Sequence, residues 1–174
     1  MSPDVEHLFT IVRSPDLDLA IPHRARKAYR AIIWDDDRVL LIKSRKYGDW
    51  KFPGGGAEPG ERAFAALARE TAEETGYQLK TRIKPFGVTR EYGKGDGGNG
   101  LFCNESHYYV CTVHPTPGVQ RLSAYEIEHG YEPIWMTPDA AADENDRVPD
   151  DPAIPWKKRE TAVLRLLAAR RKNP

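Results

Sequence analysis

Two apolar stretches near the start of the chain have the pattern of paired strands. Tyr29–Trp34 and Val39–Lys43 are rich in β-branched and aromatic residues, and the acidic residues Asp35–Asp37 separate them. Such stretches around a polar turn are typical of a β-hairpin. Gly and Pro accumulate in residues 49–61 and 93–100, which are therefore predicted to be loops. Further strands are predicted at His7–Arg13, Leu79–Ile83, Phe86–Thr89, His107–Val113 and Glu132–Met136.

Helical spacing of apolar residues begins after the first of these loops. Arg62–Thr75 contains no Gly or Pro and is dominated by strong helix formers, and Gly76 has the position of a C-cap. We expect this helix to bury Phe64, Leu67, Ala68, Thr71 and Ala72. A short helix is predicted at Pro138–Glu144 and an amphipathic one over residues 156–172. The second is expected to bury Val163, Leu164, Leu166 and Leu167.

The order of these elements bears on the fold class. Strands come first, one helix lies in the middle, and strands and helices follow, which favours an α+β fold with helices packed on a mixed sheet. The 174 residues correspond to one domain. We expect residues 27–174 to form it and residues 1–26 to be an N-terminal extension or a first strand.

Composition excludes several classes of partner. Lys plus Arg and Asp plus Glu both number 26, so no overall field attracts nucleic acid or a membrane surface. No apolar run has the ~18 residues of a membrane span, and the opening MSPDVEHLFT lacks the pattern of a signal peptide. Cys103 and Cys111 are too few for a disulfide framework and are interpreted as reduced thiols. These features predict a soluble, cytoplasmic protein.

The middle helix carries an unfavourable cluster of acids. Glu70, Glu73 and Glu74 have the spacing i, i+3 and i+4, which brings their side chains to neighbouring positions. Repulsion between Glu70 and Glu74 costs about 0.2–0.5 kcal/mol, and each acid in the last turn opposes the helix dipole by roughly 0.3–1 kcal/mol. A cation is expected to compensate, and carboxylates without Cys or His suit Mg²⁺ or Mn²⁺. A solvated acidic face paired with lysines is the alternative.

The residues around this cluster have a regular spacing. Gly55 is followed by Glu61, Arg69-Glu70, Glu73-Glu74 and Gly76 at the intervals of the Nudix box, G-x5-E-x7-R-E-U-x-E-E-x-G-U, in which U is aliphatic. The segment Gly55–Tyr77 therefore resembles that box. Thr71 and Tyr77 depart from it, since both stand where the family has aliphatic residues. We expect the Thr71 hydroxyl to bond to the carbonyl of Leu67. The resemblance implies an α/β/α sandwich with a mixed β-sheet between helices.

The resemblance also implies roles for individual residues. Divalent metal ions would be held by Glu70, Glu73 and Glu74. Glu70 would in addition activate water, and Arg69 would orient the Glu70 side chain. Glu61 is assigned either to metal binding or to capping of the helix, where an anion is favourable. Gly54 and Gly55 would let the backbone approach the ion and the phosphates, although turn formation alone would also require glycine.

Residues outside the box leave alternatives open. Arg45 is predicted to contact a substrate phosphate, with solvent exposure as the alternative. The nearby aromatic side chains either stack on a base or pack: Tyr47, Trp50 and Phe52. A further acid is expected from outside the box, and the choice lies between Glu126, Glu128 and Glu132.

Taken together, the residues and the resemblance predict an enzyme. It would use Mg²⁺, or Mn²⁺, to hydrolyse a phosphoanhydride bond in a small nucleoside-diphosphate-linked substrate, such as a nucleoside polyphosphate or dinucleotide polyphosphate. The alternatives are a catalytically silent Nudix-like module that senses a nucleotide, and an isomerase or glycosylase use of the same fold. The resemblance further implies that a homodimer can form.

Overall fold

The computed structural model describes residues 5–23, 25–95 and 100–172. Within this part of the chain the strands form one seven-stranded sheet with the order β1-β5-β6-β2-β3-β4, and β7 also pairs with β3. The strands are β1 (His7–Val12), β2 (Ala25–Asp35), β3 (Arg38–Ser44), β4 (Trp50–Lys51), β5 (Leu79–Lys94), β6 (Leu101–Val113) and β7 (Tyr131–Met136). The pairs β1/β5 and β2/β6 are parallel and the other pairs are antiparallel, so the sheet is mixed.

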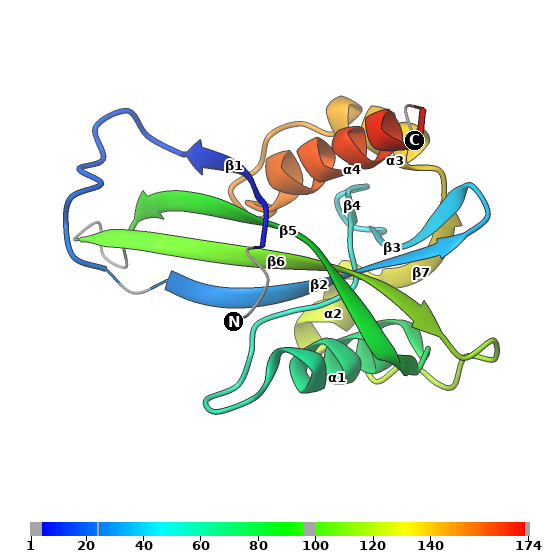
Figure 1. Ribbon diagram of the computed structural model, residues 1–174. Coiled ribbons are helices and arrows are strands. Elements are labelled where there is room, and N and C mark those ends of the chain that lie inside the picture. Colours follow the sequence, from blue (N-terminus) through cyan, green and yellow to red (C-terminus); the bar gives the residue numbers. More distant parts are fainter. Residues whose placement is uncertain (1–4, 24, 96–99, 173–174) are drawn as a thin grey trace.

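Helices cover both faces of this sheet (Figure 1). The helices are α1 (Ala63–Thr75), α2 (Ala124–His129), α3 (Pro138–Arg147) and α4 (Lys157–Lys172). On β2, Ile32 packs in the cluster that contains Val163 and Leu164 of α4, whereas Ala31 and Ile33 pack with Leu67 of α1. Because successive strand residues face opposite sides, the middle of β2 is buried on both. The predicted α+β class and the arrangement of a mixed sheet between helices are confirmed.

Most predicted elements are present with shifted ends. The hairpin forms, and Asp36 at its turn adopts a left-handed conformation with φ 52°. The two strands predicted at 79–83 and 86–89 are one continuous strand, β5, because its long antiparallel pairing with β6 runs through an irregularity between Pro85 and Gly87. Gly93 and Lys94 therefore belong to a strand and not to the predicted loop, of which residues 96–99 lie outside the described residues.

Helix α2 was not predicted. Its local signal is a capping box, in which the Ser123 hydroxyl accepts from the Glu126 amide while the Glu126 carboxylate accepts from the Ser123 amide at 2.7 Å. The helix spans only six residues, which is too short for an apolar period to be visible in the sequence.

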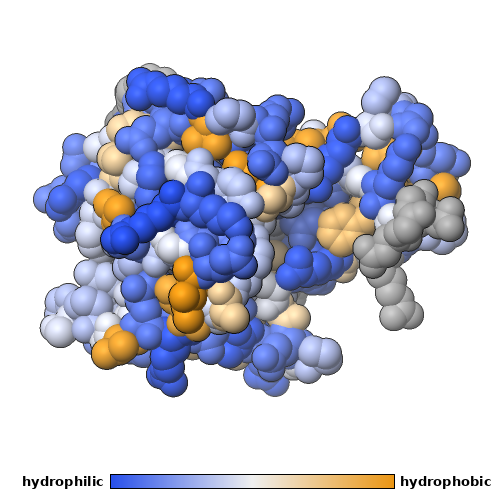
Figure 2. All heavy atoms as spheres, turned by 180° about the vertical axis from the view of Figure 1, so that it is seen from behind, coloured by the Kyte–Doolittle hydropathy of each residue, from blue (hydrophilic) through white to orange (hydrophobic). Residues whose placement is uncertain are grey.

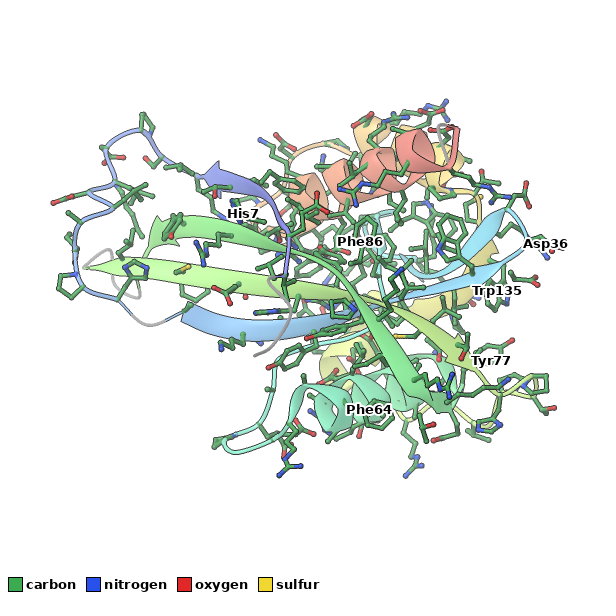
Figure 3. All side chains as sticks on the ribbon, viewed as in Figure 1. His7, Asp36, Phe64, Tyr77, Phe86 and Trp135 are labelled. Atoms are coloured by element: carbon green, nitrogen blue, oxygen red, sulfur yellow. The ribbon has the colours of Figure 1, made fainter. Side chains whose placement is uncertain are left out.

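The buried face of α1 differs in part from the predicted one. Gly76 ends the helix as predicted, with φ 78°. Burial is confirmed for Leu67 and Thr71, and the other buried residues are Ala66, Glu74 and Thr75. Phe64, labelled on α1 in Figure 3, is 37% exposed, and it borders a shallow hollow beside β5 residues 81–84. The expected bond from Thr71 to the Leu67 carbonyl is absent, since the Thr71 hydroxyl has no partner among the described residues. Thr75 makes a bond of that kind to the Thr71 carbonyl, at 2.6 Å.

Tyr77, the other departure from the motif, has a packing role. Its ring lies edge-on to that of Trp135 on β7, with 6.0 Å between the centroids (Figure 3). The aromatic residue thus fills the apolar layer between α1 and the sheet that an aliphatic residue would otherwise fill.

The N-terminal segment contributes an edge strand, since β1 pairs with β5 from His7 to Val12. The division of the chain at residue 27 stays a prediction. Cys103 and Cys111 are buried and free, in agreement with the interpretation as reduced thiols. In the described ranges no helix is long and apolar enough to cross a bilayer. Figure 2 shows a rear face that is mostly hydrophilic, with apolar residues scattered over it; dimerisation stays a prediction.

Candidate active site

The loop that precedes α1 is fixed along the edge of β2. The amides of Ala31 and Tyr29 donate to the carbonyls of Pro53 and Gly55, both at 2.9 Å. Gly54 has φ 128°, and a Cβ there would overlap the Tyr29 carbonyl oxygen, so this position requires glycine. The loop backbone therefore lies close against the strand and leads directly to the first turn of α1.

Three carboxylates converge on the guanidinium of Arg69, a residue in the middle of α1. Its Nη1 lies 2.8 Å from Glu70 Oε1 and 3.3 Å from Glu73 Oε2, and its Nη2 lies 2.9 Å from Glu61 Oε2. Hydrogen bonds from Arg69 lower the pKa of Glu61. The expected contact between Arg69 and Glu70 is formed, and Glu61 joins the same cluster, 3.0 Å from Arg69 Nε through Oε1.

Glu70 has the properties of a proton acceptor. Its side chain is 17% exposed and lies against the Cα of Gly55, where a Cβ would overlap the carboxylate. Burial raises the pKa of Glu70, and the hydrogen bond from Arg69 opposes that shift. A carboxylate with a raised pKa beside a glycine loop can take up a proton at a pH nearer to neutrality than an exposed one.

Glu74 has different neighbours, although it was predicted to act with Glu70 and Glu73. It is only 1% exposed, its Oε1 lies 2.5 Å from Lys51 Nζ, and its Oε2 accepts from the Gly54 amide at 2.7 Å. Both carboxylate oxygens are therefore engaged by β4 and by the loop. The compensating cation that the acidic helix required is in part Lys51, whose pairing with Glu74 the sequence analysis did not predict.

The donor set fits a hard divalent cation by its chemistry. The carboxylates of Glu61, Glu70 and Glu73 and the Gly56 carbonyl, which accepts from Arg69 at 3.4 Å, offer only oxygen. Across the described ranges, however, no three acidic, His or Cys groups form a ready-made metal site. The carboxylates are instead held by Arg69 and Lys51, so a bound cation would share these carboxylates with the two residues or displace them.

The residues predicted outside the box have local partners. Arg45 is 71% exposed and is paired with Glu132. Lys46 pairs with Glu128 at 2.5 Å, and Glu126 caps α2. Each of the three candidate acids thus has a partner outside the active site that accounts for its position. The geometry therefore does not show which of them contributes to the site.

Two other arginines lie closer to the loop, and the sequence analysis missed both. Arg30 Nη1 donates to the Gly54 carbonyl, and the Arg26 guanidinium lies beside Gly56. No local sequence signal identifies them, because the contact depends on the loop running along the edge of β2.

Aromatic residues near the loop mostly belong to the core. Trp50 and Phe52 are 2% and 0% exposed and pack in the cluster beneath α4, which confirms the packing interpretation for these two. Tyr47 is half-buried and lies beside the His129 ring at 5.3 Å.

A cavity of about 550 Å³ lies on the α4 side of the sheet, between β1, β5 and residues 150–158. Its buried lining residue Glu91 is paired with Arg13 at 3.2 Å and with Arg159. Arg159 also pairs with Glu160, which accepts from the Phe52 amide at 2.8 Å. A buried polar network therefore connects this cavity to the strand that leads into the glycine loop.

The NUDIX domain profile matches residues 24–157, more than three quarters of the chain. The chain belongs to the Nudix family. With this, the predicted enzyme class, a hydrolase acting on pyrophosphate bonds, is confirmed at the level of the family.

Individual relatives are more distant. A protein of Bacillus subtilis (strain 168) named "Putative 8-oxo-dGTP diphosphatase" is 27% identical over 123 residues, covering 68% of this chain and 76% of the relative. "Diphosphoinositol polyphosphate phosphohydrolase 2" of Rattus norvegicus is 50% identical over 46 residues, only 26% of each chain. The crystal structure of the "mMutator MutT protein" of Bacillus halodurans has a TM-score of 0.56 at 24% identity, covering 80% of this chain and 82% of that one. This structural likeness concerns the fold.

Proposed function

We propose that this Nudix protein hydrolyses a phosphoanhydride bond in a small nucleoside-diphosphate-linked substrate with the help of Mg²⁺. The observation that carries the proposal is the convergence of Glu61, Glu70 and Glu73 on Arg69, directly beside the Gly55 backbone. Relatives named as a diphosphatase and as an RNA pyrophosphohydrolase support the reaction class. The balanced charge of the chain supports a small substrate in place of a nucleic acid.

The residues of the site would have separate roles in binding the cation and the substrate. Glu70 and Glu73, with Glu61, would hold the divalent cation, and Glu74 would join them only by giving up Lys51. The cation, when bound, neutralises phosphate charge and makes water easier to deprotonate. Gly54 and Gly55 lack side chains and so admit the diphosphate close to Glu70.

The proposed reaction is an in-line displacement at phosphorus. A water oxygen forms a bond to one phosphorus while the bond from that phosphorus to the bridging oxygen breaks. The proton of the water passes to the Glu70 carboxylate, and the leaving phosphate carries the electron pair away. Arg69 keeps Glu70 ionised and oriented through its contact of 2.8 Å.

The test is a substrate panel. The purified protein is incubated with Mg²⁺ and nucleoside triphosphates, ADP-ribose, diadenosine polyphosphates or nucleotide sugars, and the products are separated by ion-exchange chromatography. We expect selective cleavage that Glu70→Gln abolishes while the variant remains folded. Wild-type turnover in this variant would refute the role of Glu70. Tight binding of a nucleotide without any product would instead support the sensing module.

A further inference from the structure

Lys51 is a buried cation beside the acidic cluster. The residue is 9% exposed, its Nζ lies 2.5 Å from Glu74 Oε1, and it stands over the Tyr131 ring at 4.4 Å from the centroid. A charged group in such surroundings requires a partner, because the loss of hydration is otherwise not offset. Lys51 and Glu74 therefore depend on each other in this arrangement.

The pair also joins three segments that are distant in sequence. Lys51 comes from β4, Glu74 from the last turn of α1, and the second oxygen of Glu74 accepts from the Gly54 amide of the loop. Helix α1 has no basic residue in its last turn, where an anion opposes the dipole. Lys51 supplies from the sheet the positive charge that the helix itself lacks.

We propose that Lys51 is a built-in counter-cation that occupies Glu74 in the metal-free protein and thereby sets how tightly the acidic cluster takes up a divalent cation. The proposal rests on the metal dependence of the proposed function. A cation bound by this cluster meets the fixed positive charge of Lys51, or must displace it from Glu74. Lys51 is thus a positioning residue, which stabilises the metal-free loop at the expense of cation affinity.

The chain provides a matched control for the test. Lys46 pairs with Glu128 at the same N–O separation of 2.5 Å, but the two side chains are 39% and 66% exposed and belong to another part of the surface. Lys51→Met and Lys46→Met remove the same charge and keep an unbranched side chain. Only Lys51→Met removes a positive charge that lies beside the acidic cluster.

The experiment measures the Mn²⁺ dissociation constant of the metal-free variants by titration calorimetry, together with thermal unfolding with and without Mn²⁺. We expect Lys51→Met to melt at a lower temperature than wild type without Mn²⁺. It should also bind Mn²⁺ on the order of tenfold more tightly, because a nearby like charge is removed at an intermediate dielectric. Lys46→Met should match wild type in both measurements, and Lys51→Arg should retain the wild-type affinity.

Unchanged or weaker Mn²⁺ binding by a folded Lys51→Met variant would overturn the proposal and leave a purely structural ion pair. If that variant does not fold, the double variant Lys51→Met/Glu74→Gln, which leaves no unpaired buried charge, is compared with Glu74→Gln alone. Tighter binding by the double variant supports the counter-cation, and equal or weaker binding overturns it. Absence of Mn²⁺ binding and of cleavage in wild type would refute the proposed function and this proposal with it. Cleavage by wild type, together with an unaltered Mn²⁺ affinity in Lys51→Met, refutes only the counter-cation proposal.

Discussion

Gly55→Ala tests the position of Glu70 without changing its chemistry. A Cβ at residue 55 would lie 2.5 Å from Cδ and 2.7 Å from Oε1 of Glu70, whereas ordinary contacts begin near 3.4 Å. The carboxylate must therefore move by roughly 1 Å. Gly55 does not have a positive φ, so the backbone itself tolerates alanine. Overlap with a flexible side chain should leave the fold intact.

Displacement of a catalytic group by ~1 Å can cost on the order of 10²-fold in rate. We expect kcat for the Mg²⁺-dependent cleavage to fall by about that factor. The assay is steady-state hydrolysis of the best substrate from the panel, with circular dichroism melting as the check on folding. Gly118→Ala is the matched control, since its Cβ would meet only an ordinary contact at 3.6 Å.

The double variant Gly55→Ala/Glu70→Gln completes a double-mutant cycle for these two residues. If alanine acts only by moving Glu70, the double variant should be no slower than Glu70→Gln alone. Wild-type kcat in Gly55→Ala would refute the reasoning, because it would show that the position of Glu70 against the loop does not matter. A further loss in the double variant would place the effect of Gly55 elsewhere.

Three further predictions concern the helix and its cation. Burial raises the pKa of Glu70, so the folded metal-free protein binds the proton of this carboxyl group more tightly than the unfolded chain does. The unfolding free energy of wild type relative to Glu70→Gln, measured by urea titration, should therefore fall as the pH rises from the ordinary glutamate range through the raised pKa. An unfolding free energy difference that does not change with pH would contradict the shift. Leu67→Ala deletes a fully buried side chain between α1 and the sheet and should cost about 2–5 kcal/mol by urea unfolding; a loss below ~1 kcal/mol would argue against the described packing. Removal of divalent ions with EDTA should abolish cleavage and excess Mg²⁺ should restore it, and activity that survives EDTA would exclude the proposed cofactor.

The parts of the fold that depend on local sequence were predictable. The hairpin, helix α1 and its end at Gly76 follow from turn residues, propensity and a C-cap, all of which act within a few residues. Helix α2 carried a capping box of the same local kind, at Ser123 and Glu126, and was overlooked. The buried face of α1 was mistaken at Phe64, because hydrophobicity alone does not show that this side chain borders a hollow beside β5.

The acidic residues of the site were predictable from the sequence, but their contacts were not. Spacing in the motif indicates the acids, yet it does not show that Lys51 pairs with Glu74 or that Arg30 bonds to the Gly54 carbonyl. These contacts join residues more than twenty positions apart. The first arises from the position of β4 beside α1, and the second from the course of the loop along β2. The expectation for Arg45 was drawn from sequence proximity to the loop, and its contact with a phosphate stays a prediction, since the exposed side chain pairs with Glu132 in the structure.

Hydrolysis in ¹⁸O-labelled water, followed by ³¹P NMR, tests the central claim most directly. With Mg²⁺ and the preferred substrate, we predict two phosphate-bearing products, one of which gains a single ¹⁸O at phosphorus in each turnover. Neither Glu70→Gln nor the EDTA-treated protein should form them. Products without labelled phosphate, or labelled products formed equally well by Glu70→Gln, would contradict hydrolysis by the carboxylates of α1.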